Sequence, residues 1–430
     1  MVQNAPRAWL ITVSNPKSRL WIFLIAALAI IYFINCFTPL RLTIDTVRYF
    51  AIKENLEGKQ PDLFGSVHDF LPYGYVLFLA ALSKLGMLST FTIAFLQLLY
   101  LAGSLFFVTR IFSATAKAAP LILFTLLNWM TLKFTITPLS EMQFLFFSAG
   151  ALYFFQQYEI NKRLISLFWL VIFCGAAVFT RTIGIVLPAA LLITLLLNKR
   201  KFLVQWIAAK KIVAGITLSV FSLLVIFFFT LPGVQTYLSH FAAPLLENPV
   251  YFFSHNIYKH TLEWGEMFIN IPFSKIQLLL PGNGIKIFYV ITGLLFLVLV
   301  IKRLLQRRFE TPLSVKIYLV FYSVLLFNWP LFEVRLWFPV LPFFIGILFH
   351  QGKSSKPVIK QILTLYKLLY IAAGIAAMCY YTWLCFTREE FARRHDAGIW
   401  QREYEQYFFG KKTTGEAVDE KALYILNHYD

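Results

Sequence analysis

The sequence predicts an all-α integral membrane protein, and its composition and hydropathy pattern support this prediction. Of the 430 residues, 59% are hydrophobic and only 14% are charged, whereas soluble domains are about one-quarter charged. Apolar runs of about 20 residues, long enough to cross the hydrocarbon as helices, recur along nearly the whole chain. Consequently, no stretch remains that would form a large soluble domain.

We expect about 11 transmembrane helices. They are residues 20–38, 89–110, 119–137, 141–157, 164–180, 183–197, 212–231, 284–301, 313–328, 336–350 and 366–386. Segment 70–87 is apolar but short, opens with Pro72 and Gly74 and carries Lys84. It would either cross the membrane or lie at its interface.

Loop charge favours the second arrangement. The basic residues behind the net charge of +18 gather in short loops between spans. If segment 70–87 does not cross, these loops share one side with the N-terminus, and the positive-inside rule places that side in the cytoplasm. The basic character is then a feature of topology, so we expect a lipid bilayer and no nucleic acid as partner.

The same topology sends the acidic and aromatic loops to the extracytoplasmic side. We expect residues 1–386 to form a transmembrane module, with a first outer loop at 39–88 and a second at 232–283, and residues 387–430 to form a small outer tail. The four cysteines lie in or beside apolar runs without metal-ligand spacing, so no disulfide is expected. His255 and His260 are five residues apart, which is not the spacing of a helical zinc pair.

The first outer loop opens with a predicted short helix over residues 43–57. Thr43 is its expected N-cap and Gly58 its C-terminal stop. Asp45, in the first turn, would complement the helix dipole or pair with Arg48 three residues later. Alternatively, an amphipathic helix lying in the interface would hold this carboxylate at headgroup depth, beside a lipid phosphate.

Several stretches, taken in order, resemble the C-type glycosyltransferases (GT-C), membrane enzymes that include protein mannosyltransferases and bacterial aminoarabinose transferases. The matching stretches are IDTVRYF at 44–50, HDFLPYGYVLFLAALSKLG at 68–86, TPLSEMQFLFFSAGALYFF at 137–155, FTRTIGIVLPAALLITLLL at 179–197 and FEVRLWFPVLPFF at 332–344. Together they extend over most of residues 20–350. Many relatives carry an acidic pair in the first loop, whereas here Thr46 follows Asp45.

The resemblance implies a GT-C-like helical bundle in a bacterial inner membrane, with its active site outside the cytoplasm. Its donor would be a sugar on undecaprenyl phosphate or a similar polyprenyl phosphate, and its acceptor a lipid, glycan or protein. Asp45 would be the catalytic base, and Arg335, with Arg181 and Lys133, would hold the donor phosphate. The remaining candidate substrate-binding residues are Arg48, His68, Asp69 and Glu141.

Three alternatives stay open from the sequence. A divalent metal would require ligands, for which Asp45 and Glu141 are the only candidates, and no cofactor is assigned. Arginines at the outer ends of spans also snorkel to headgroups without further function. The protein would otherwise be a transporter or flippase for lipid-linked glycans, or a glycan polymerase or ligase.

Overall fold

The computed structural model describes residues 16–65, 72–113, 118–199, 232–306, 311–348, 357–410 and 418–430. All regular secondary structure in these ranges is helical, as the sequence predicts. The predicted span 212–231, together with His68 and Asp69, lies outside the described residues.

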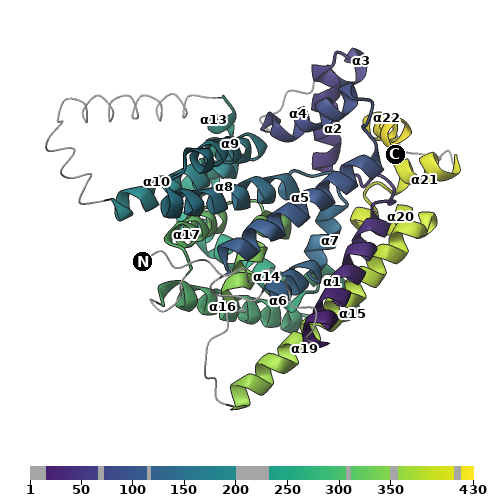
Figure 1. Ribbon diagram of the computed structural model, residues 1–430. Helices are drawn as coiled ribbons and strands as arrows, with labels where there is room; N and C mark the ends of the chain where they lie inside the picture. The colour runs from purple at the N-terminus through teal and green to yellow at the C-terminus, as the bar shows by residue number, and fades with distance from the viewer. Residues whose placement is uncertain are drawn as a thin grey trace, which may run out of the picture.

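The helices follow one another from the purple to the yellow end of the chain in Figure 1. They are α1 (Pro16–Asn35), α2 (Ile44–Leu56), α3 (Pro61–Phe64), α4 (Tyr73–Lys84), α5 (Thr90–Ile111), α6 (Ala118–Leu126), α7 (Trp129–Thr135), α8 (Glu141–Asn161), α9 (Leu164–Thr180), η1 (Thr182–Ile185), α10 (Val186–Asn198), α13 (Pro232–Glu247), α14 (Pro249–Ile269), α15 (Phe273–Leu279), α16 (Asn283–Leu305), α17 (Leu313–Phe327), η2 (Val334–Val340), α18 (Leu341–Leu348), α19 (Pro357–Phe386), α20 (Arg388–Arg394), η3 (His395–Gly398), α21 (Gln401–Phe409) and α22 (Glu420–Tyr429).

Three helices in the described part of the chain are long and apolar enough to cross a membrane. They are Thr90–Ile111, Asn283–Leu305 and Lys360–Phe386, and the pair α6–α7, bent by 69°, is a fourth if it counts as one span. The shorter apolar helices of 10–17 residues are Arg19–Asn35, Leu164–Thr180, Thr182–Asn198, Leu313–Phe327 and Val334–Leu348. All of these coincide with predicted spans, while the full count of about 11 stays a prediction.

The bend between α6 and α7 interrupts the predicted span 119–137. Asn270, at the left-handed end of α14, fills the break: its Oδ1 accepts from the Trp129 amide at 2.8 Å, and its Nδ2 donates to the Leu127 carbonyl at 2.9 Å. Asn128 caps α7 by accepting a hydrogen bond from the Met130 amide at 3.1 Å. Backbone groups freed in an apolar surrounding need such internal partners, so the bend is supported by side chains.

Residues 232–283, expected as a large outer loop, contain three helices in this structure. The longest, α14, lies directly against α16, because a Cβ atom on Gly293 would overlap the Thr261 carbonyl and one on Gly265 would overlap the backbone of Tyr289. Trp264, on the same helix, is almost fully buried. α14 is therefore part of the packed bundle.

The first outer loop begins with α2, and both of its predicted ends are confirmed. The Thr43 hydroxyl accepts from the Thr46 amide at 3.1 Å, and Gly58, just beyond the helix, has φ of +66°. The rest of α2 is largely buried against α4 and α22; Lys53, for example, donates to Glu54 and to the Tyr429 hydroxyl, both at 2.8 Å. The helix is thus packed in the protein over most of its length.

Residues after α19 pack onto this first loop. The Tyr404 hydroxyl donates to the Leu40 carbonyl at 2.6 Å and accepts from the Leu42 amide at 2.8 Å. The Asp430 carboxylate accepts from the Leu40 amide at 2.6 Å. Figure 1 shows the yellow helices α20 to α22 next to the purple α1 and α2, so segments from opposite ends of the sequence meet here.

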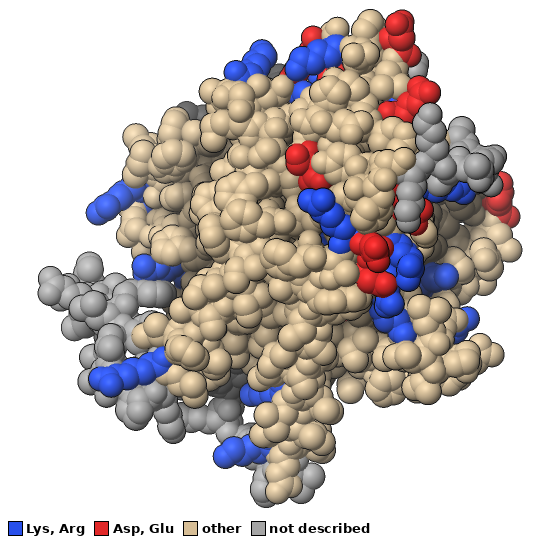
Figure 2. Space-filling view, turned by 90° about the vertical axis from the view of Figure 1, so that its right-hand side faces the viewer, with Lys and Arg blue, Asp and Glu red and all other residues tan. Residues whose placement is uncertain are grey.

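The surface seen in Figure 2 is mostly uncharged. Acidic side chains appear on its upper part, where Figure 1 shows α2 and α22, and near mid-height, whereas the charged residues drawn on the lower part are Lys or Arg. Charge of the two signs is therefore unevenly distributed along the vertical axis of this face.

Candidate functional site

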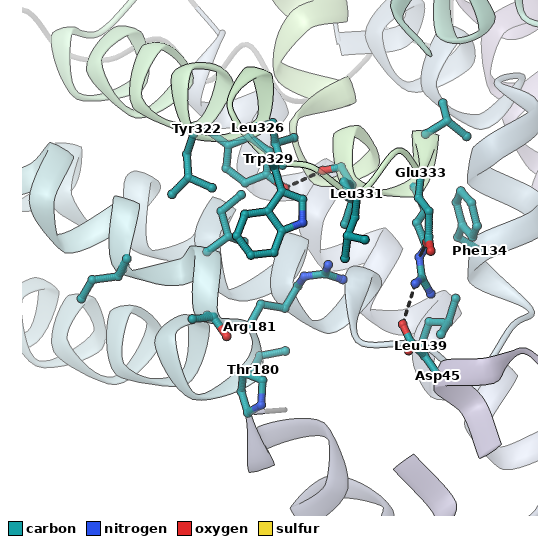
Figure 3. A pocket seen from close by; sticks show the side chains of 18 of the residues that line it. Asp45, Phe134, Leu139, Thr180, Arg181, Tyr322, Leu326, Trp329, Leu331 and Glu333 are labelled. Atoms are coloured by element: carbon teal, nitrogen blue, oxygen red, sulfur yellow. Dashed lines mark hydrogen bonds and ion pairs between the residues drawn. The ribbon is translucent and has the colours of Figure 1, made fainter. Parts of the chain in front are cut away.

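A cavity of about 1460 Å³ lies among α2, α7, η1, α10, α17 and η2. We call it the central cavity. One part of its wall is apolar, with residues such as Ile185, Leu192 and Leu325, while another part carries both acidic and basic side chains. Figure 3 shows this division: Tyr322, Leu326 and Trp329 lie on one side, and Asp45 and Glu333 on the other.

Arg335 is the centre of the charged part. Its Nη2 lies 2.5 Å from Asp45 Oδ2, its Nε forms an ion pair with Glu333, and Glu141 Oε1 is 3.7 Å from Nε. Three carboxylates from separate parts of the sequence thus converge on one guanidinium. The fork of five N–H groups makes arginine suited to this role and leaves donors for a further anion.

Arg181 forms the second basic contact. It follows the last residue of α9, and its Nη1 lies 2.5 Å from Glu141 Oε1 and 3.3 Å from the Ser140 hydroxyl. The same hydroxyl pairs with the Tyr49 hydroxyl at 3.0 Å. Glu141, at the first position of α8, therefore links the two arginines from behind the cavity wall, and it does not cap its helix through a side-chain hydrogen bond.

Asp45 lines the central cavity and also occupies the first turn of α2. Its Oδ1 lies 3.5 Å from Arg48 Nη1, so the local ion pair expected from their spacing is present. The side chain of Asp45 is 21% exposed, and that of Arg48 36%. The Asp45 carboxylate therefore complements the dipole of α2 and is also exposed to the cavity.

Lys133 enters the cavity from α7, just beyond the bend. Its Nζ lies 5.8 Å from the ring centre of Trp129 and 5.4 Å from that of Phe134, distances at which an ammonium is attracted by aromatic faces. Within the described residues, this ammonium group has no hydrogen bond or ion pair. A largely buried ammonium without a close counter-ion is energetically costly, which is typical of a ligand-binding position.

Glu333 was not a candidate from the sequence, although it stands two residues before Arg335. Its side chain is 48% exposed, but the opening faces the cavity. Loss of bulk water there raises the pKa of Glu333; Arg335 opposes the shift, and the nearby Asp45 carboxylate adds to it. Glu333 thus takes up a proton more readily than an ordinary glutamate.

The sequence also gave no signal for the last group of cavity residues, His395, Asp396 and Ile399. They come from the tail after α19, outside every stretch that resembles a family. Burial and the neighbouring Arg41 lower the pKa of His395 well below its usual range, so the ring is neutral at pH 7. Its Nε2 then donates to the Leu42 carbonyl at 2.7 Å.

The structure brings together Asp45, Arg48, Lys133, Arg181 and Arg335 on the cavity wall, with Glu141 directly behind. His260 lies elsewhere: its ring nitrogens contact Glu263 at 2.7 Å and the Trp329 carbonyl at 2.9 Å.

No group of three or more His, Cys, Asp or Glu suited to a metal ion occurs among the residues that the structure describes. Asp45 and Glu141 are instead both in contact with guanidinium groups, and their use as metal ligands stays a prediction.

Comparisons with protein-family models, curated proteins and solved structures found no match to this chain.

Proposed function

We propose that this protein is a glycosyltransferase of the GT-C type that moves a sugar from a polyprenyl-phosphate donor to an extracytoplasmic acceptor. The observation that carries the proposal is the central cavity itself, in which an apolar wall adjoins a cluster of arginines and carboxylates. An amphiphilic ligand that carries an anionic group next to a long apolar chain would match these two parts of the cavity.

The apolar wall supports a lipid as one substrate. Residues of η1, α10 and α17 supply it, and α10 and α17 also carry exposed apolar side chains that do not line the cavity, such as Leu197 and Val320. A prenyl chain would therefore meet apolar surface both inside the cavity and at its border. Burying such chains is favourable at about 25 cal/mol per Å².

The arginines support a phosphate as the anionic group. Arg335 and Arg181 are held in place by Asp45, Glu333 and Glu141, so their orientation does not depend on the ligand. Guanidinium groups bind phosphate oxygens through paired hydrogen bonds. They would also stabilise the negative charge that gathers on the phosphate as it leaves the sugar.

The reaction would be a direct displacement with inversion. The acceptor hydroxyl oxygen bonds to the anomeric carbon while the bond from that carbon to the phosphate oxygen breaks. The hydroxyl proton passes to the carboxylate of Asp45, and the electron pair of the broken bond leaves with the prenyl phosphate. A positioned base of this kind contributes about 10²- to 10⁴-fold to a rate.

The test uses purified protein supplied with labelled prenyl-phosphate sugars. We expect sugar transfer, or slow donor hydrolysis without acceptor, and a loss of about 10²- to 10⁴-fold in turnover for Asp45→Asn. Asp62→Asn, an exposed carboxylate of α3 in the same outer loop, is the matched control and should retain activity. Turnover of Asp45→Asn close to the wild-type value would refute the assignment of the base.

The same preparation distinguishes the enzyme from a transporter. Reconstituted vesicles that move intact prenyl-phosphate sugar between leaflets, without release of prenyl phosphate, would show that the protein is a lipid-linked-glycan transporter.

A further inference from the structure

The tail after α19 contributes a strained turn to the wall of the central cavity. Asp396 and Ala397 have φ of 47° and 57°, and Gly398 has φ of 81°, so three successive residues are left-handed. Residues other than glycine seldom adopt this conformation, and where they do the surroundings must hold them. Asp396 lines the central cavity from this turn.

The turn is fastened to the segment that carries Asp45. His395 is 4% exposed, its ring stacks on Phe391 at 4.9 Å, and its Nε2 donates to the Leu42 carbonyl at 2.7 Å. Leu42 directly precedes the N-cap residue Thr43 of α2. The position of Asp396 is thus coupled to the start of α2, which carries Asp45.

Asp396 and Lys133 both line the central cavity, and their side chains form no direct ion pair in the described structure. Each group therefore keeps hydrogen-bonding capacity for a ligand: the ammonium donates and the carboxylate accepts. Vicinal hydroxyl groups, which both donate and accept, suit such a pair.

The cavity offers different surfaces to the different parts of the donor. Figure 3 shows Leu326 and Trp329 on one side of it and Asp45, Glu333 and Phe134 on the other, and Lys133 and Asp396 also line this cavity. A prenyl-phosphate sugar likewise combines an apolar chain, a phosphate and a polar sugar ring.

We propose that Lys133 and Asp396 form a binding site for the hydroxyl groups of the donor sugar, next to the phosphate site at Arg335. This inference rests on the proposed function and makes the tail a determinant of sugar specificity. Lys133 then has a different role from Arg335, because it recognises the sugar and the arginine recognises the phosphate.

The experiment compares the affinity for bare prenyl phosphate with that for a panel of prenyl-phosphate hexoses and amino sugars. The wild-type protein should bind at least one member roughly 10- to 100-fold more tightly than the bare lipid, as expected for hydrogen bonds to charged groups. Asp396→Asn and Lys133→Met should each remove most of this preference, measured as the ratio of the two affinities of the same variant. Asn is tolerated in the left-handed region, so the first variant keeps the turn.

Glu389→Gln, an exposed carboxylate in the same tail, is the control and should retain the preference. A preference that survives both site variants, an equal loss of both affinities, or no preference in the wild-type protein would overturn the inference and leave the lipid-phosphate site standing. Failure of the wild-type protein to bind any prenyl phosphate would overturn the proposed function as well.

Discussion

Arg335 is a residue whose partners come from far apart in the chain. Asp45 lies in α2, Glu141 in α8, and Glu333 in the segment before η2. A phosphate approaching this guanidinium competes with the carboxylates already there. Glu333 is the most exposed of the three, so a phosphate displaces its carboxylate from Arg335 most readily.

This competition makes a prediction for pH. The raised pKa of Glu333 means that it is neutralised at a higher pH than an ordinary glutamate as the solution is acidified. Wild-type affinity for a prenyl-phosphate sugar should therefore rise as the pH falls below neutral, since Arg335 is then freed from one ion pair. The phosphodiester probe keeps its own charge over this range, so the change reports on the protein.

The variant Glu333→Gln fixes the neutral state. At neutral pH it should bind the same probe about 3- to 10-fold more tightly than wild type, a modest effect because the pair is partly solvated. Its affinity should stay flat across the pH range in which that of the wild type rises. Parallel pH profiles for the two proteins would contradict the role assigned to Glu333, and Glu389→Gln serves as the control.

Among the elements, the bent pair α6–α7 brings a charged residue to the cavity wall. A straight helix over 119–137 would continue in the direction of α6, whereas the 69° bend lets α7 direct Lys133 and Phe134 to the cavity wall. The bend depends on Asn270, which bonds to groups on both sides of it.

Replacing Asn270 by Leu should therefore destabilise the protein. The change leaves the Trp129 amide and the carbonyls of Leu127 and Tyr370 without this partner, and each buried unsatisfied group costs about 1–3 kcal/mol. We expect a clearly lower melting temperature in detergent, followed by intrinsic fluorescence. Asn161→Leu, at the exposed end of α8, is the control, and equal melting of the two variants would count against the prediction.

The contact between α14 and α16 gives a second prediction at this scale. Gly293→Val would insert atoms where the Thr261 carbonyl lies, an overpacking that costs typically about 1–3 kcal/mol. Gly175→Val on α9 introduces the same side chain into open space and should leave the melting temperature nearly unchanged. A melting temperature for Gly293→Val as high as that of Gly175→Val would show that the helices separate at little cost.

The sequence predicts those elements that depend on local patterns. The length of the apolar runs predicts the helical segments, and capping residues predict the start and end of α2 at Thr43 and Gly58. The bend at Leu127 and Asn128 was not foreseen, because the residue that supports it, Asn270, is more than 140 positions away. Nor was the packing of α14, whose many polar residues resemble those of an exposed loop.

The candidate site divides in the same way. Asp45, Arg181 and Arg335 were identified through motifs at the ends of spans, and the structure places them around one cavity. Glu333 stands two residues before Arg335 in the matching stretch 332–344 but was not assigned a role, whereas Asp396 lies outside every such stretch and reaches the cavity only through tertiary packing. Charged residues in polar stretches are usually solvated, so no local pattern distinguishes Asp396.

For the whole molecule, the uneven charge in Figure 2 bears on the proposed orientation. Lys302 and Arg303 lie in the last turn of α16, and the positive-inside rule assigns that end to the cytoplasm. The tail with α20 to α22 would then lie outside. Both assignments are accessible to labelling.

We predict that Gly410→Cys reacts with a membrane-impermeant maleimide in intact cells, whereas Gln306→Cys reacts only after permeabilisation. Gly410 ends α21 in the tail, and Gln306 follows α16. The unsubstituted protein is the blank for its four native cysteines. The reverse pattern would invert the proposed topology and place the central cavity on the cytoplasmic side.

The turn at His395–Gly398 also has a consequence for biogenesis. A ribosome makes the chain from its N-terminus, so Asp45 and α2 leave the exit tunnel some 350 residues before this turn. Until α19 has been inserted and the tail has reached Leu42, the central cavity lacks one wall. The cavity of the nascent protein is thus complete only after the chain has been synthesised beyond residue 398, so the wall that holds Asp45 must wait for the tail.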